Sequence, residues 1–190
     1  MTKNLSASEA ERNAVALRML KFEARTRTIR LATGLSEEQI RRLYHKAAMA
    51  KTSQRHRGRS PSSVAQFTRN HSAQLEASIV SGVLVKHGLL KGRRPKPWLN
   101  IGMHYAQLFC AAYTEYLQIA HRALNFEQAW YFARSLAARG EIYLQYCGRC
   151  NSHFVRDMAT VLKHPCPVCK LREQQNGLKA LQPLSSNMAQ

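Results

Sequence analysis

The chain has 190 residues, 45% of them hydrophobic, which suits one ordinary core with a small appended module. Its 29 Lys and Arg against 11 Asp and Glu give a formal charge of +18, and this excess predicts attraction to a polyanion, most simply nucleic acid. No apolar run approaches the roughly 20 residues that span a bilayer, and the N-terminus lacks a signal-peptide core, so we expect no membrane partner and a cytoplasmic location.

Residues 8–31 are predicted to form one helix. Apolar residues recur there at steps near three and four, and no Gly or Pro interrupts the stretch. The residues that carry this pattern are Ala14, Leu17, Leu20, Ala24 and Ile29. Ser8 is the expected cap, with Glu9 and Glu11 placed favourably in the first turn.

A second helix is predicted to start at Glu37, after a turn that contains Gly34. Ser36 and Gln39 have the spacing of a capping box, and helix, Gly-containing turn, helix is the helix-turn-helix arrangement. Its inner face would be Leu35, Ile40 and Leu43, and the candidate DNA contacts on its outer face are Arg41, Arg42, His45 and Lys46. A plain αα-hairpin with a solvated basic face is the alternative, because Arg30 stands where the motif usually has a small residue.

Two basic connections add further candidate DNA contacts. Residues 51–62 form a polar linker with Arg55, Arg57 and Arg59, which has little apolar surface to bury. A second loop carries Arg93 and Arg94 between Gly92 and two prolines. Charge runs are more often solvated than bound, so direct contact with phosphates is one of two open interpretations.

The middle of the chain is predicted to supply the helical core. Helices are expected over residues 63–90, 100–123 and 126–138, each with apolar or aromatic residues at helical spacing. The aromatic and large aliphatic residues of the last two are Tyr105, Leu108, Phe109, Tyr113, Tyr116, Leu117, Trp130, Phe132 and Leu136. Cys110 lies among them without a partner cysteine and is expected to be an inert packed thiol.

Four cysteines near the C-terminal end have the spacing of a zinc site. Cys147 and Cys150 form one Cys-x-x-Cys pair, and Cys166 and Cys169 form the second pair after fifteen intervening residues. Four thiolates fill a tetrahedron and leave no open position, so the sequence predicts one structural Zn²⁺. Gly148 supports this interpretation, because glycine can adopt the positive φ that the turn between two paired cysteines often needs.

Other uses of the four cysteines fit less well. Disulfides are rare in the cytosol, a redox Cys-x-x-Cys would be a single pair beside a βαβ pattern, and the zinc-deaminase signature requires an upstream His-x-Glu that the chain lacks.

Residues 142–146 and 153–155 are predicted as short strands of a zinc ribbon. His153 and His164 are expected not to be ligands, and the basic residues around the metal are Arg149, Arg156, Lys163 and Lys170.

The predicted fold class is therefore mainly α, a helical bundle with an N-terminal helix-turn-helix-like segment and a small C-terminal zinc ribbon with four cysteine ligands. The expected divisions are a helical region at 1–50, the linker at 51–62, a helical core at 63–140, the zinc module at 141–172 and a flexible tail at 173–190.

The segment GLSEEQIRRLYHKA (34–47), followed late in the chain by the paired cysteines, resembles the FlhC family, one subunit of the bacterial flagellar master transcriptional activator. The resemblance implies cysteine-ligated zinc, a hetero-oligomer with an FlhD-like subunit, binding to double-stranded promoter DNA and recruitment of RNA polymerase. FlhC-like activators also occur on conjugative elements, so the resemblance leaves flagellar and conjugative-transfer genes open as targets.

Two other classes share these features. An RNA-binding zinc-ribbon protein would have the same charge and cysteines, and a protein-docking adaptor would carry its charge incidentally. An enzyme is not expected, because the sequence offers no open metal site, nucleophile–base pair or phosphate loop, and so no small-molecule substrate.

Overall fold

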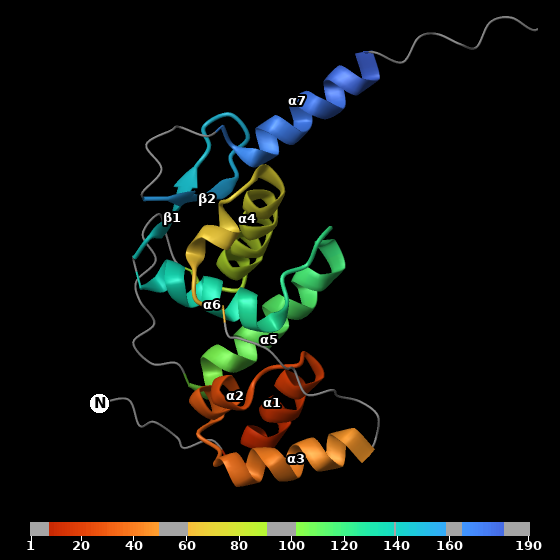
Figure 1. Cartoon of the computed structure of the whole chain (residues 1–190), viewed down its shortest axis with the longest axis vertical. Helices are drawn as coiled ribbons and strands as arrows, with labels where there is room; N and C mark the ends of the chain where they lie inside the picture. Colours follow the sequence, from red (N-terminus) through yellow and green to blue (C-terminus); the bar gives the residue numbers. More distant parts are fainter. Residues whose placement is uncertain (1–7, 50–60, 91–101, 139, 159–164, 181–190) are drawn as a thin grey trace, which may run out of the picture.

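The computed structural model describes residues 8–49, 61–90, 102–138, 140–158 and 165–180. Within these ranges the chain is mainly helical with one two-stranded antiparallel sheet, which confirms the predicted fold class (Figure 1). The elements are α1 (Glu9–Lys21), α2 (Thr26–Thr33), α3 (Glu37–Met49), the 3-10 helix η1 (Val64–Phe67), α4 (His71–Lys86), α5 (Met103–Ile119), α6 (Phe126–Ala137), β1 (Ile142–Tyr146), β2 (His153–Asp157) and α7 (Pro167–Ala180).

The prediction of a single helix over residues 8–31 is wrong. The capping box of Ser8 and Glu11 starts α1 as expected, but the chain turns at Phe22–Arg25 before α2 begins. Glu23 adopts a left-handed backbone with φ of 59°, and Ala24 is fully buried in the turn. The break also shifts the buried face of α1, since Ala14 and Leu17 are exposed and Val15, Ala16, Met19 and Leu20 are buried.

The turn between α2 and α3 forms as the sequence predicts. Gly34 takes a left-handed φ of 71°, and its N–H donates to the carbonyl of Arg30 to end α2. Ser36 and Gln39 make both hydrogen bonds of the capping box, at 2.9 and 3.2 Å. Leu35 and Ile40 are buried as predicted. Arg30 lies outside the helix contact and pairs with Glu37 at 2.9 Å, so it does not obstruct the packing of α3.

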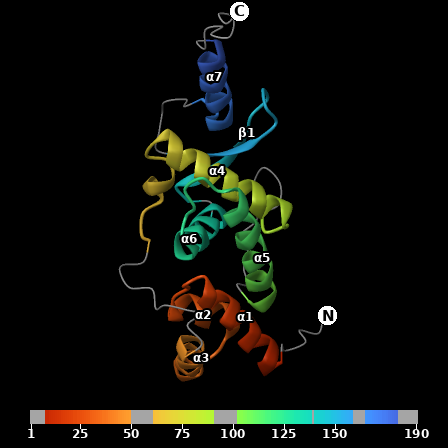
Figure 2. The ribbon, with the colours of Figure 1, turned by 90° about the vertical axis from the view of Figure 1, so that its right-hand side faces the viewer.

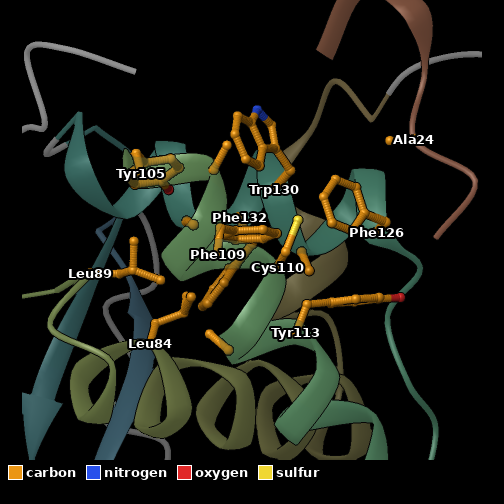
Figure 3. Close-up of a cluster of buried hydrophobic side chains, with 14 of the residues drawn as sticks. Ala24, Leu84, Leu89, Tyr105, Phe109, Cys110, Tyr113, Phe126, Trp130 and Phe132 are labelled. Carbon is orange, nitrogen blue, oxygen red and sulfur yellow. The ribbon is translucent and has the colours of Figure 1, made fainter. Parts of the chain in front are cut away.

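The helical core is built around aromatic side chains of α5 and α6 (Figure 3). Phe109 of α5 lies at its centre and is 1% exposed, with ring centroids 4.8 Å from Trp130 and 5.3 Å from Phe126. The helix predicted over 63–90 is interrupted, because η1 ends at Phe67 and Asn70 caps the start of α4 by accepting the N–H of Ala73.

The sheet is docked on α4, as the quarter-turned view in Figure 2 shows. Buried side chains of α4 satisfy the backbone of Val155, since Gln74 donates to its carbonyl at 2.9 Å and Ser78 accepts its N–H at 3.3 Å. Ile142 and Leu144 are buried in the same hydrophobic cluster as the helices. The hairpin is therefore continuous with the core rather than a separate module.

The end of the described chain differs from the prediction. The second cysteine pair lies at the start of α7, and residues 173–180, which are predicted to belong to the flexible tail, continue this helix. Residues 181–190 lie outside the described ranges. Helices α1–α3 lie at one end of the molecule and the hairpin with α7 at the opposite end, in both views (Figures 1 and 2).

Candidate metal centre and basic surfaces

The four cysteines predicted as ligands converge on one point. The Sγ atoms of Cys147 and Cys169 are 3.7 Å apart, those of Cys150 and Cys166 are 3.6 Å apart, and all four lie within 4.8 Å of one another. A Zn–S bond of about 2.3 Å in a tetrahedron corresponds to sulfur–sulfur distances of about 3.8 Å. The four sulfurs thus match a closed, four-coordinate structural metal site.

The first cysteine pair lies in the turn that joins β1 to β2. The N–H of Cys147 donates to the carbonyl of Ser152 at 3.0 Å, and the N–H of Asn151 donates to the carbonyl of Cys147 at 2.9 Å. The left-handed residue of this turn is Asn151, with φ of 57°, and Gly148 does not use its freedom to adopt a positive φ. Asparagine tolerates this conformation, so the turn forms without glycine there.

The second pair lies at the start of α7. Cys166 and Cys169 are buried, and the N–H of Lys170 donates to the carbonyl of Cys166 at 3.0 Å, which closes the first helical turn. Phe154 and Val168 pack with the four cysteines in one small hydrophobic cluster. His71 of α4 contacts the carbonyl of Pro167 at 3.0 Å through Nε2 and attaches the start of α7 to the core.

The surroundings divide the thiols into two kinds. Hydrogen bonds from the backbone of Cys150 and Arg149 hold the pKa of Cys147 below its ordinary value, and although burial raises the pKa of Cys150, hydrogen bonds from Ser152 and neighbouring thiols lower it to about 6. Burial instead raises the pKa of Cys166, and that of Cys169 to about 12. A metal would therefore meet one pair that readily forms thiolates and displace protons from the other.

Neighbouring side chains complete the site. Arg149 pairs with Glu173 of α7 at 2.9 Å, which links the hairpin turn to the helix on the other side of the cysteines. The ring of His153 lies edge-on to that of Tyr146, and the cluster of potential metal ligands found among the described residues consists of the four cysteines. His164 lies outside the described residues. Glu173 and Ser152 could not be found from the cysteine spacing alone.

Thiol reactivity should separate these cysteines from the fifth. Cys110 is fully buried, and burial raises the pKa of its thiol to about 12, so the reactive thiolate is scarce at neutral pH. Removing the metal with a chelator should open the start of α7 and expose Cys166 and Cys169, whereas Cys110 stays packed in the helical core. We therefore expect a thiol reagent such as DTNB to modify four cysteines rapidly and Cys110 only after a denaturant is added. Five rapidly reacting thiols in the native protein would contradict this arrangement.

Helix α3 presents the basic residues of the N-terminal end. Arg41, Arg42, His45 and Lys46 are all exposed. Arg42 pairs with Glu38 at 2.5 Å, whereas no partner among the described residues is found for Arg41, His45 or Lys46. The first turn of α3 carries Glu37 and Glu38, so the positive surface lies on its later turns.

The remaining predicted DNA contacts are distributed over other parts of the chain. Arg149 is exposed and ion-paired, Lys170 is exposed on α7, and Arg156 of β2 is half-buried and donates to Gln145 at 2.9 Å. These three lie at the end of the molecule opposite α3 (Figure 1). Arg55, Arg57, Arg59, Arg93, Arg94 and Lys163 lie outside the described residues.

The closed four-cysteine cluster is typical of a structural metal site, and the helical hairpin of α2 and α3 presents a basic outer surface. The family model described as "Flagellar transcriptional activator (FlhC)" matches residues 1–180, so the chain belongs to this family. The resemblance inferred from the sequence is thereby confirmed. No curated protein matches the chain. Among the described residues, no helix is long and apolar enough to cross a membrane.

Proposed function

We propose that the chain is the DNA-binding subunit of a transcriptional activator that works in the cytoplasm as a hetero-oligomer with an FlhD-like subunit. The complex binds double-stranded promoter DNA and recruits RNA polymerase to flagellar genes. Genes for conjugative transfer are the alternative targets that the sequence leaves open. Membership of a family of flagellar transcriptional activators is the observation that carries the proposal.

The metal in this proposal is zinc. Four thiolate ligands in a closed tetrahedral arrangement suit zinc, which needs neither redox chemistry nor an open position in a structural site. Cys147, Cys150, Cys166 and Cys169 would hold it, and it would supply a rigid cross-link between the hairpin turn and the start of α7. Purified protein should contain one equivalent of zinc.

The cations on the later turns of α3 support DNA binding. Arg41, His45 and Lys46 are exposed without a described acidic partner, so they can approach phosphates or base edges without first breaking an ion pair. The basic residues of 51–62, together with Arg93 and Arg94, would add phosphate contacts. Arg149, Arg156, Lys163 and Lys170 would contact DNA only if the site extends along the molecule to the metal end.

Fluorescence anisotropy over a salt series tests the proposal. The chain would be measured alone and co-purified with its FlhD-like partner, on labelled promoter duplex and on scrambled duplex of the same composition. Each phosphate contact should contribute about −0.9 to the slope of log K against log salt. We expect a steep slope, with preference for the promoter in the co-purified complex.

Two results would contradict this function. A steep slope without promoter preference would indicate a general nucleic-acid-binding protein. Effective competition by structured RNA would then favour an RNA-binding function. Affinity that hardly depends on salt would instead favour a protein-docking role.

A further inference from the structure

One peptide group connects the basic helix α3 to the core helix α6. The N–H of Arg25 donates to Oε1 of Glu127 at 2.9 Å, and the carbonyl of Ala24 accepts the hydroxyl of Tyr44 at 2.8 Å. These two groups belong to the same peptide bond. Glu127 lies on α6 and Tyr44 on α3, so one peptide unit of the turn between α1 and α2 is held from both sides.

The surroundings make this connection rigid. A peptide unit is planar, and Ala24 is fully buried in the same hydrophobic cluster as Phe126 (Figure 3). Phe22, two residues earlier, stacks on Phe126 with centroids 5.6 Å apart and meets Tyr113 edge-on at 5.0 Å. The turn therefore cannot rotate without breaking aromatic contacts as well as hydrogen bonds.

Glu127 is suited to its place. The residue is 7% exposed, and its carboxylate also accepts the hydroxyl of Thr28 at 2.9 Å. Arg25, the N-cap residue of α2, makes no side-chain capping bond of its own, so Glu127 supplies the cap from 102 residues away. The carboxylate lies at the N-termini of both α2 and α6, where helix dipoles favour negative charge.

We propose that Glu127 and Tyr44, acting through the Ala24–Arg25 peptide, are positioning residues that fix the orientation of α3 and thereby the base-specific contacts of Arg41 and His45. This inference rests on the proposed DNA binding. Tyr44 comes three residues after Arg41 and directly before His45 on α3, so the bond from its hydroxyl restricts rotation of the helix about its axis. Base contacts are short and directional, whereas attraction to phosphates tolerates small rotations.

The test compares Tyr44→Phe, Glu127→Ala and the double variant, each co-purified with the FlhD-like partner. Each is measured on the duplex that the wild-type complex selects from a random library and on scrambled duplex. Losing one hydrogen bond should lower the ratio of the two affinities about fivefold. Affinity for scrambled duplex and its salt slope should stay unchanged. Since both residues hold one peptide, the double variant should lose less than the sum of the two losses on a logarithmic scale.

Tyr113→Phe is the matched control. Its hydroxyl also donates to a backbone carbonyl, that of Leu124 at 2.9 Å, within the core rather than toward α3. This variant should lose a similar amount of stability and keep full promoter preference. A purely structural role of Tyr44 would make Tyr44→Phe behave in the same way.

The outcomes separate the two proposals. If the wild-type complex shows no preference for any duplex, the proposed function fails and this inference with it. If the wild type shows preference and Tyr44→Phe retains it, only the inference is overturned, and additive losses in the double variant overturn it as well. Should Glu127→Ala fail to fold, Tyr44→Phe against Tyr113→Phe still decides.

Discussion

Removing the metal should unfold α7 and the turn between β1 and β2 while the rest of the chain stays folded. The two strands are held independently of the metal, because Ile142, Leu144 and Val155 are buried in the main core. Beyond its first turn, α7 is held by the surface ion pair of Glu173 with Arg149, and residues 172–176 are exposed. An isolated helix of 14 residues is only marginally stable in water.

Cys166→Ser tests this expectation, because it removes one ligand at the start of α7. Trypsin should then cleave rapidly after Lys170 and Arg172, and the helical signal in circular dichroism should fall only by the share of α7. Cys110→Ala is the control, since it removes a cysteine outside the metal site and should keep both the metal and the protease resistance. Unchanged cleavage at these two positions, or collapse of the whole fold, would contradict the assignment of the metal to a local role.

Metal binding by the unmodified protein should depend on pH. Binding displaces protons from Cys166 and Cys169, since burial raises the pKa of both thiols. The metal-bound form thus carries fewer protons than the metal-free form, and higher pH strengthens binding. As pH falls, protons compete with the metal first for the buried pair and then for Cys147 and Cys150, whose pKa values are lowered. Metal release and unfolding of α7 should therefore increase together on acidification.

Features that depend on a few neighbouring residues could be predicted from the sequence. The capping box at Ser36 and Gln39 and the left-handed Gly34 form as expected because their hydrogen bonds join residues three or four apart. The four candidate metal ligands could be picked out for a similar reason, since each Cys-x-x-Cys pair is a local unit and only the meeting of the two pairs is non-local.

The turn at Phe22–Arg25 could not be predicted, because its stabilising contacts come from distant parts of the chain. It contains neither Gly nor Pro, and Glu23 takes a left-handed backbone that its residue type does not favour. Tyr44 and Glu127, 20 and 102 residues away, hold the turn. The helical pattern of the sequence continues across this turn, but tertiary contacts break the helix there.

Helix α7 could not be predicted because its sequence has no helical apolar pattern. Its residues after Lys170 are mostly polar and give no apolar stripe, so composition resembles a tail. The helix is started by Cys166 and Cys169 and by the pairing of Glu173 with Arg149. The same pairing changes the interpretation of Arg149, since its charge is already balanced by a glutamate that sequence spacing does not reveal.

Phe109→Ala should be the most destabilising single substitution outside the metal site. Its ring is 1% exposed and lies within 6.4 Å, centroid to centroid, of four other aromatic rings, those of Tyr105, Tyr113, Phe126 and Trp130. Truncating a buried phenylalanine costs about 3–5 kcal/mol, a large part of the roughly 5–15 kcal/mol that stabilises a typical domain. Urea denaturation followed by circular dichroism should show a lower midpoint with a similar slope.

Leu117→Ala on the same helix is the matched control. Leu117 is 43% exposed, and alanine is a better helix former, so the free energy of unfolding should change by less than about 0.5 kcal/mol. Because Phe126 and Tyr113 also contact Phe22, the cavity left by Phe109→Ala should loosen the N-terminal helices too. Helices α1–α3 and the core should therefore unfold in one transition in both variants. A separate early transition of α1–α3 would mean that the aromatic contacts do not couple them to the core.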